Sequence, residues 1–420
     1  MLFRLELENF YSVQDLQVID LRLADNVPAI SHRFAPIHLG SKERAPKVVT
    51  IFGPNASGKS MALRGLTFLS WFVQHSFLQL PAATDQPPPG TGFQPCERFY
   101  SRDASDKLTR LCAHFTGALN FSEPPEKRNR FCRYAYEVSF RSEAAADGFI
   151  RKPRTVMHES VRQWPEPSGK SVRVFERNER GEVAASKEFG LSGYEKIIDK
   201  VRSNASVIST LLQFDHPPSL LMRDVARTVL SNILIERLEL TDDTVLRTAY
   251  APNLPLLEAL NRDIERIDLG IRAIRIVPGT QGPLAQFDHY GLSDPLPIQL
   301  ESHGTRQFIR IFPMIAQALQ IGGVAVIDEL DQSIHPSILP EIIRWFHDPQ
   351  RNPHDAQLWI TCQAASLLED LEKEEVFFCE KSREGETRIY GLRDVQAVRR
   401  TDNFYKKYLG GVYGAVPKVG

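Results

Sequence analysis

Apolar and polar residues alternate at the start of the chain, where Phe3, Leu5 and Leu7 occupy every second position. A period of two is typical of a β-strand with one buried face, so we expect a strand there. Similar patterns predict further strands at 19–23, 111–115 and 131–140.

The pattern becomes helical in the middle of the chain. From 193 to 240, apolar residues recur mostly at spacings of three and four, which predicts helices. A second helical stretch at 254–267 precedes a strand-like run at 271–277. A short, mainly apolar run at 48–52 and a fully apolar run at 324–327 are typical of buried strands. The sequence therefore predicts an α/β protein.

We expect the two apolar strands, 48–52 and 324–327, to share one sheet although they lie far apart in sequence. The polar, turn-rich region 141–190 and the helical pattern after it predict an inserted lobe. The predicted fold class is α/β, with a mixed or parallel sheet in a head domain and an inserted helical and β lobe. The expected divisions are 1–140 for the N-terminal part of the head, 141–270 for the lobe, helical in its second half, and 271–420 for the C-terminal part of the head.

The turn after the first apolar strand reads GPNASGKS and matches the pattern G-x-x-x-x-G-K-[ST] of a phosphate-binding loop. In such a loop the backbone N–H groups surround the phosphates of a nucleotide, and a helix begins at the lysine. Lys59 would reach the β- and γ-phosphates, and the Ser60 hydroxyl would bind Mg²⁺. The alternative is a chance glycine turn. The predicted nucleotide-binding residues here are Gly53, Pro54, Asn55, Ala56, Ser57, Gly58, Lys59, Ser60 and Met61.

The second apolar strand ends in two acids, Asp328 and Glu329, as a Walker B strand does. We expect Asp328 to bind Mg²⁺ and Glu329 to polarise the water that attacks the γ-phosphate. A buried strand that ends in solvated acids is common, so the prediction depends on the phosphate-binding loop being present as well.

A turn before the Walker B strand, ESHGTRQF, lies where ABC-type ATPases carry a signature motif. In that class the signature turn of one protomer binds the γ-phosphate held by the other. Ser302, Gly304 and Thr305 are the predicted nucleotide-binding residues of this turn. An ordinary N-capped helix is the alternative.

Three further positions are candidates for the same site. Gln363 ends the apolar strand predicted at 358–363, where most ABC-type ATPases have a histidine that contacts the γ-phosphate. His303 or His335 is an alternative source of that contact. Gln94 is a candidate Mg²⁺-sensing glutamine, or else an exposed loop residue. Tyr11 stands where related ATPases often carry a basic residue, and it could instead pack under the loop.

Composition excludes several classes of protein. The 51 Lys and Arg nearly cancel the 52 Asp and Glu, so the net charge does not indicate a nucleic-acid-binding protein. The five cysteines are scattered without C-x-x-C spacing, which favours reduced thiols over disulfides or a zinc site. The start of the chain lacks a signal-peptide pattern and no apolar run is long enough to span a membrane, so we expect a cytoplasmic protein.

Taken together, these stretches resemble a family of bacterial ABC-type ATPases related to the SMC, RecF and OLD-type proteins. The likeness is strongest to the RloA/AbiLi group of abortive-infection and restriction-linked ATPases, and it spans essentially the whole chain. The stretches that carry it are LELENFYSVQDLQ, FGPNASGKS, SNASVISTLLQFDHP, ESHGTRQF, VAVIDELDQSIHP and FYKKYLGGVYGAVP.

The resemblance implies an ATPase that uses ATP and Mg²⁺ and forms a homodimer, or a higher homo-oligomer, with ATP between the heads. It also implies a role in defence against phage beside a smaller TOPRIM-like or nuclease-like effector protein. The sequence departs from the family at Tyr11, Gln363 and Ala364. Because glutamine cannot carry a positive charge, we expect slow hydrolysis and intact ATP binding.

Two other functions stay open at this point. One is a DNA-repair or DNA-processing ATPase, for which the basic clusters 127–133 and 151–154 could supply a binding surface or could simply be solvated. The other is a stand-alone phosphotransferase. It is disfavoured because the sequence has no acceptor-site motif, whereas it does have a candidate signature turn.

Overall fold

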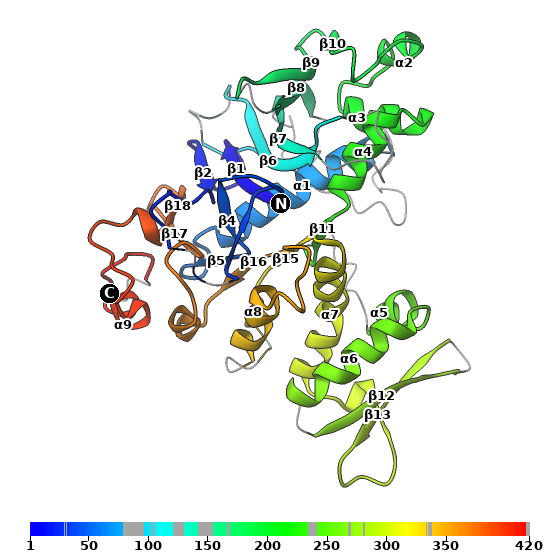
Figure 1. Cartoon of the computed structure of the whole chain (residues 1–420), viewed down its shortest axis with the longest axis vertical. Coiled ribbons are helices and arrows are strands. Elements are labelled where there is room, and N and C mark those ends of the chain that lie inside the picture. The colour runs from blue at the N-terminus through cyan, green and yellow to red at the C-terminus, as the bar shows by residue number, and fades with distance from the viewer. Residues whose placement is uncertain are drawn as a thin grey trace.

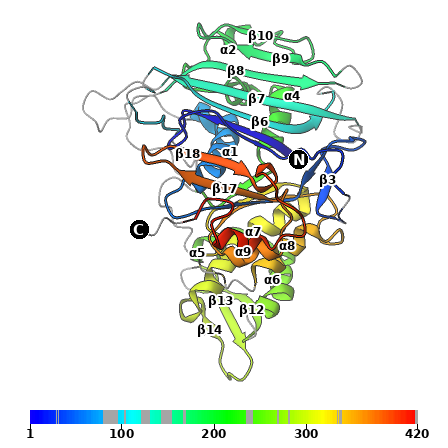
Figure 2. The same cartoon turned by 90° about the vertical axis from the view of Figure 1, so that its left-hand side faces the viewer.

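The computed structural model describes residues 1–28, 30, 32–78, 96–101, 104, 106–120, 130–141, 154–165, 169–233, 242–267, 270–279, 282–332, 334 and 338–416. It confirms the α/β class. Two large sheets lie one above the other, and helix α1 (Lys59–His75) contacts both of them (Figure 1). An arm of helices and short strands extends below the lower sheet (Figure 2).

The upper sheet is antiparallel, with the strand order β10-β9-β8-β7-β6-β1-β2. Strands β1, β6 and β7 lie where the alternating pattern predicts strands. The predicted strand at 19–23 ends early, at Asp20: Leu21 N–H still donates to the Phe3 carbonyl of β1, but Leu23 N–H donates to the Arg44 carbonyl instead. The strands are β1 (Leu2–Glu8), β2 (Gln17–Asp20), β6 (Thr109–Ala118), β7 (Phe131–Arg141), β8 (Thr155–Trp164), β9 (Val172–Arg177) and β10 (Val183–Ala185).

The lower sheet has the order β11-β15-β16-β5-β17-β18, and all of its neighbouring strands are parallel except the antiparallel pair β17 and β18. The prediction that the two apolar strands share a sheet is confirmed, with β16 between them. Since the carboxyl ends of parallel strands meet at one edge, the loops after β5, β15 and β16 lie together. The strands are β5 (Val48–Phe52), β11 (Val229–Ser231), β15 (Val324–Ile327), β16 (Gln357–Cys362), β17 (Val376–Lys381) and β18 (Thr387–Gly391).

The helical pattern predicted for 193–240 is confirmed as far as Ala226 and is wrong at the strand that follows, Val229–Ser231. Three helices form, α2 (Glu195–Ile198), α3 (Val207–Leu211) and α4 (Pro217–Ala226), and strand β11 follows them. The physical reason is the neighbouring sheet, because β11 pairs in parallel with β15 at its edge. A three-residue strand has too few positions to show a period in the sequence.

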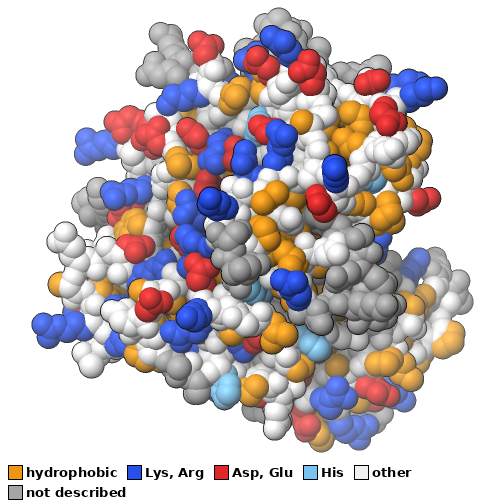
Figure 3. Space-filling view, turned by 45° about the horizontal axis from the view of Figure 1, so that its top comes forward, with side chains coloured by type: hydrophobic (Ala, Val, Ile, Leu, Met, Phe, Trp, Pro, Cys, Tyr) orange, Lys and Arg blue, Asp and Glu red, His pale blue; other side chains and the backbone are white. Residues whose placement is uncertain are grey.

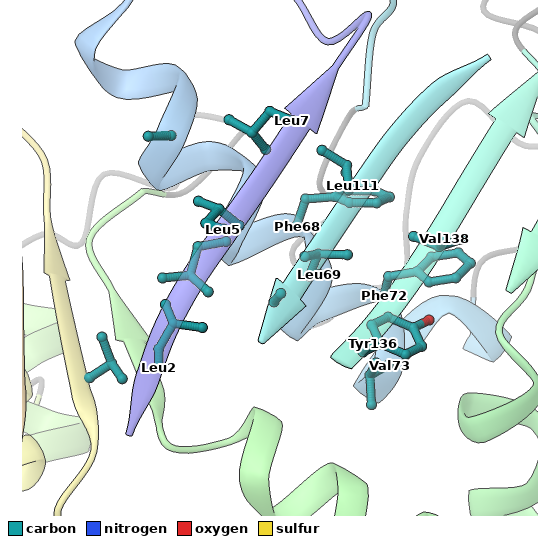
Figure 4. Close-up of a cluster of buried hydrophobic side chains, with 14 of the residues drawn as sticks. Leu2, Leu5, Leu7, Phe68, Leu69, Phe72, Val73, Leu111, Tyr136 and Val138 are labelled. Carbon is teal, nitrogen blue, oxygen red and sulfur yellow. The ribbon is translucent and has the colours of Figure 1, made fainter. Parts of the chain in front are cut away.

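The upper core forms where α1 packs against strands β1, β6 and β7 (Figure 4). Phe68 and Phe72 of α1 stack with ring centroids 5.6 Å apart, and Phe140 of β7 meets both rings edge-on. This packing fixes the axis of α1, and its first residue is the lysine of the phosphate-binding loop.

The lower core joins the other face of the lower sheet to the helices around the arm. In the arm, α6 packs against β12 of a three-stranded antiparallel sheet, and Tyr250 donates a hydrogen bond to the Ile309 carbonyl of α7. The predictions at 254–267 and 271–277 are confirmed by α6 and β12. The elements are α5 (Asp242–Val245), α6 (Leu254–Ile267), β12 (Ile271–Val277), β13 (Leu284–His289), β14 (Leu296–Pro297), α7 (His303–Ile321) and α8 (Leu339–His347).

The remaining elements are the pair β3 (Phe34–Pro36) and β4 (Arg44–Pro46), and helix α9 (Phe404–Leu409). Within the described ranges, no helix is long and apolar enough to cross a membrane. Strand β8 pairs with β7 across the expected division at 140/141, so the upper sheet includes residues from both sides of it. The three-part division of the chain stays a prediction.

Candidate nucleotide-binding site

Two glycines give the phosphate-binding loop its shape. Gly53 and Gly58 have φ values of 154° and 100°, which side chains rarely adopt. A Cβ at Gly53 would lie 2.4 Å from the Cys379 carbonyl oxygen, and one at Gly58 would lie 2.1 Å from Thr387 Oγ1. The loop can therefore pass close to β17 and β18 only with glycine at both positions.

Strand β18 and the turn after β1 hold this loop from the side opposite α1. Thr387 Oγ1 donates to the Ser57 carbonyl at 2.9 Å, and Thr387 N–H donates to the Ser12 carbonyl at 2.7 Å. The loop opens the 17-residue helix α1, and the N-terminus of a helix attracts anions. The arrangement suits a phosphate group.

Lys59 lies at the centre of the loop. Its Nζ donates to the carbonyls of Gly53 at 2.8 Å and Pro54 at 3.0 Å. Burial lowers the pKa of Lys59 from its usual value, while the nearby negative groups, Glu329 among them, oppose this effect. Because those carbonyls are weak partners for an ammonium group, phosphate oxygens would be better ones.

Ser60 and Asp328 meet at the carboxyl edge of the lower sheet. Ser60 Oγ donates to Asp328 Oδ1 at 2.9 Å, and Thr361 Oγ1 donates to the same oxygen at 2.5 Å. Hydroxyl and carboxylate oxygens are ligands that Mg²⁺ prefers, so the residues present fit this ion. The third metal candidate, Gln94, lies outside the described residues.

Glu329 lines the same pocket as Lys59 and Ser60. The pocket has a volume of about 620 Å³ and is bounded on its open side by Tyr11 and by the turn after β17. Glu329 is exposed and has a φ of 52°. The two predicted acids of the Walker B strand thus reach the phosphate-binding loop. The lining residues are Tyr11, Ser12, Asn55, Ala56, Ser57, Gly58, Lys59, Ser60, Met61, Phe99, Tyr100, Ser101, Glu329, Lys381, Glu384 and Gly385.

Tyr11 both packs against its neighbours and faces the pocket. Its ring meets Phe10 edge-on at 4.8 Å, and the guanidinium of Arg64 lies 5.7 Å from the ring centroid. Burial raises the pKa of Tyr11 to about 12, so the phenol is neutral at pH 7. Tyr11 therefore supplies no positive charge at this position.

Gln363 lies at the end of β16 with an exposed side chain, and it is not among the described residues that line the pocket. Its backbone N–H donates to Asp331 Oδ2 at 2.7 Å, and that of Ala364 donates to the same oxygen at 2.6 Å. Asp331 fixes the start of this loop, a role that the sequence did not indicate. Of the alternative histidines, His303 is the first residue of α7, and His335 lies outside the described residues.

The predicted signature turn forms the start of α7, away from the pocket of its own chain. Ser302 is the N-cap: its Oγ accepts a hydrogen bond from Thr305 N–H at 3.1 Å. Gly304 lies in the first turn of the helix. The alternative of an N-capped helix therefore describes the local structure, and it does not exclude a contact with a nucleotide held by another copy.

Asp242 and His289 hold this turn from two sides. Asp242 accepts hydrogen bonds from Arg306 and Arg310, both at 2.7 Å. His289 of the arm lies 2.7 Å from Glu301, the residue before the N-cap. Asp242 and His289 come from separate parts of the chain, and no local pattern marks either of them in the sequence.

Sequence reasoning also missed two residues beside the Walker B strand, Asn232 and Thr361. Asn232 Oδ1 accepts from Asp328 N–H at 2.8 Å and its Nδ2 donates to the Asp328 carbonyl at 3.1 Å. Thr361 Oγ1 accepts from Glu329 N–H at 2.7 Å. Asn232 directly follows β11, and Thr361 lies near the end of β16. These two strands flank β15, which only the folded sheet shows.

Comparison with solved structures finds SMC head domains. The SMC head domain from Thermotoga maritima is 13% identical, with a TM-score of 0.40 over 93% of this chain and 98% of that chain. An SMC head bound to the C-terminal winged-helix domain of ScpA is 14% identical, with a TM-score of 0.40 over 93% and 97% of the two chains. An SMC head domain with an extended coiled coil, bound to the C-terminal domain of ScpA derived from Pyrococcus furiosus, is 11% identical, with a TM-score of 0.41 over 93% and 96%.

No curated protein matches the sequence. One family model matches residues 135–361, which is more than half of the chain and includes the signature turn and the Walker B strand. The chain belongs to that family, described as "AAA domain, putative AbiEii toxin, Type IV TA system".

Proposed function

We propose that this protein is an ATP-binding and slowly ATP-hydrolysing homodimer that acts as the sensor and scaffold subunit of an anti-phage defence system. The observation that carries the ATPase part is the hydrogen bond to Asp328 from Ser60, which lines one pocket together with Lys59. A hydroxyl, a carboxylate and a lysine at a helix N-terminus make up the set that binds a nucleoside triphosphate with its metal.

Each residue of the pocket has a separate role in this proposal. Backbone N–H groups of 55–60 hold the phosphates, Lys59 neutralises the β- and γ-oxygens, and Ser60 and Asp328 hold Mg²⁺. The ion supplies positive charge against the phosphates when it is bound. Glu329 orients and polarises the attacking water.

Slow turnover follows from the residue after β16. A histidine would place a positive charge or a strong donor against the γ-phosphate, whereas Gln363 offers a neutral amide. A long-lived ATP state suits a protein that waits for a trigger. We propose that the signature turns of two copies, with Ser302, Gly304 and Thr305, complete each other's sites around ATP.

The family description names a putative toxin and a type IV toxin–antitoxin system, and this connection to toxin–antitoxin systems supports a role in defence. The effector we propose is a small TOPRIM-like or nuclease-like protein encoded nearby. A DNA-processing role has less support, because two arginines of the basic clusters are paired with acids: Arg133 with Glu43 at 3.2 Å and Arg154 with Glu97 at 3.4 Å. Basic and acidic side chains are also intermixed on the face shown in Figure 3.

The test is native mass spectrometry of the chain co-expressed with its neighbouring reading frames, using a Glu329→Gln variant. Removing the carboxylate stops the activation of water but leaves the phosphate contacts intact, so Mg-ATP should accumulate in a stable dimer. The effector should remain attached to this dimer. A Glu329→Gln protein that still turns over ATP at the original rate, or stays monomeric when loaded with Mg-ATP, would contradict the proposal.

A further inference from the structure

The backbone at the end of the Walker B strand is held from both sides by side chains of the neighbouring strands. On the side of β11 this side chain is Asn232, and on the side of β16 it is Thr361. We infer that Asn232 and Thr361 are positioning residues that fix Asp328 and Glu329 so that the Glu329 carboxylate stays in the phosphate-binding pocket. The inference rests on the proposed ATPase function.

Asn232 continues the ladder of β11 beyond the end of that strand. The last paired residue of β11 is Ser231, opposite Val326 of β15. Asn232 N–H still donates to the Val326 carbonyl at 3.2 Å, and its carboxamide then bonds both the N–H and the C=O of Asp328. A carboxamide presents one acceptor and one donor, as a peptide group does, so it can replace the next peptide of the strand.

On the opposite side of β15, Thr361 bonds the backbone that follows this strand. The last parallel pair between β15 and β16 is Ile327 with Ile360. Beyond it, Thr361 uses its hydroxyl for Glu329 N–H at 2.7 Å and its backbone carbonyl for Leu330 N–H at 3.2 Å. The same hydroxyl donates a hydrogen bond to Asp328 Oδ1. One buried side chain therefore fixes both the metal-binding carboxylate and the peptide that follows it.

These contacts matter because Glu329 adopts a left-handed conformation, with a φ of 52°. A residue with a side chain keeps such a conformation only where the surroundings enforce it, and such residues cluster at functional sites. Asn232 fixes the peptide before Glu329 and Thr361 fixes its N–H. With this conformation the chain turns sharply after β15 while Glu329 lines the pocket with Lys59.

The arrangement predicts a specific kinetic signature. Losing either side chain would free the Glu329 backbone to relax, and the carboxylate would spend less time against the attacking water. ATP itself is held mainly by the phosphate-binding loop, whereas the side-chain hydrogen bonds of Asn232 and Thr361 go to Asp328 and Glu329. The rate of hydrolysis should therefore fall more than the affinity for ATP.

The experiment compares Asn232→Ala, Thr361→Val and Thr361→Ser with Asn261→Ala as a matched control. Asn261 makes the same kind of carboxamide contact, to the N–H and C=O of Ile274 at 2.7 and 3.0 Å, but it lies in the arm. Asn261→Ala controls for the loss of a carboxamide–backbone contact elsewhere. Measured quantities are kcat, the Kd for a fluorescent ATP analogue, the melting temperature, and the crystal structure of Thr361→Val.

Asn232→Ala and Thr361→Val should lower kcat roughly 10- to 100-fold, the range found for groups that orient metal-site residues. Their Kd should change by less than about threefold, as expected when an interaction matters only in the transition state. Thr361→Ser, which keeps the hydroxyl, should restore most of the rate. In the structure of Thr361→Val, Glu329 should leave the left-handed region.

Several results would overturn the inference. One is an unchanged kcat in both Asn232→Ala and Thr361→Val; another is a loss of rate in Asn261→Ala as large as in Asn232→Ala. An unaltered φ of Glu329 in Thr361→Val would also reject it. If the original protein hydrolyses no ATP at all, the proposed function fails. The conformation of Glu329 in the structure of Thr361→Val then still decides whether Thr361 holds Glu329.

Discussion

Ser60 and Asp328 are 268 positions apart in sequence, and a hydrogen bond of 2.9 Å joins their side chains. Ser60 is the second residue of α1, and Asp328 directly follows β15. The strand order places only β16 between β5 and β15. This contact joins two segments of the proposed nucleotide site that lie far apart in the sequence.

The first prediction concerns Lys59, whose Nζ now binds two loop carbonyls. Lys59→Ala should abolish ATP binding, because it removes the main positive contact to the β- and γ-phosphates. The variant should stay folded, since Lys59 is not part of the apolar cluster that packs α1 against the upper sheet. Isothermal titration with Mg-ATP measures the effect.

Lys407→Ala is the control for this experiment, because Lys407 is a half-exposed lysine of α9 that pairs with Asp402 at 2.7 Å. It should bind ATP like the original protein. Tight ATP binding by a folded Lys59→Ala protein would show that the loop does not hold the phosphates.

A second prediction concerns stability at low pH. Burial alone would raise the pKa of Asp20, but hydrogen bonds from Arg22 and Arg4 lower it from 3.8 to about 2. A carboxylate with a depressed pKa in the folded state stabilises the protein above its unfolded pKa, and this contribution is lost as the pH falls from about 4 to about 2. Asp20→Asn should lower the free energy of unfolding at pH 7 by about 1–2 kcal/mol, allowing for partial solvent screening.

Urea unfolding at pH 7, 4 and 2 measures this difference. The gap between the original protein and Asp20→Asn should close towards pH 2. Asp15→Asn is the control, since the Asp15 side chain is 73% exposed and lies 3.6 Å from Lys107, a contact of little energetic value. A gap of constant size across the pH range would mean that the charge of Asp20 is not the cause.

Local patterns in the sequence were sufficient for much of the fold. The alternation of Phe3, Leu5 and Leu7, the apolar run before Gly53 and the acids after Ile327 each predicted an element that the structure contains. Such elements are predictable because burial on one or both faces requires apolar residues at a regular spacing in the sequence.

The missed features depend on contacts between distant segments. Strand β11 has three residues and forms because β15 offers it a free edge. Asn232 and Thr361 are ordinary polar residues in sequence, and their role appears only when β11, β15 and β16 lie side by side. Strand β8 pairs with β7 across the expected division at 140/141. The sequence does not show this pairing, because a polar stretch does not indicate which strands pair on either side of it.

A third prediction concerns the neutral residue after β16. Gln363→His should raise the rate of ATP hydrolysis, by about tenfold if the imidazole reaches the γ-phosphate, because it adds a strong donor that can carry charge. The backbone contact with Asp331 does not depend on the side chain and should survive. A phosphate-release assay measures the rate, with Gln350→His on a distant surface turn as the control. A rate no higher than that of the original protein would mean that residue 363 does not limit turnover.

The last prediction tests whether two copies share each site. Ser302→Arg puts a bulky side chain at the start of α7, where the nucleotide of the other copy would dock, so homodimers of this variant should be inactive. Homodimers of Lys59→Ala should be inactive as well, because neither loop holds ATP.

In a mixed dimer, one site carries both substitutions and the other carries neither, because each site combines the loop of one chain with the turn of the other. Mixing the two inactive proteins should therefore restore part of the ATPase activity, up to about one quarter of the original at equal amounts and random pairing, if each intact site works alone. Subunit exchange is verified by native mass spectrometry of differently tagged chains. Exchanged dimers without any recovered activity would contradict a site shared between two chains.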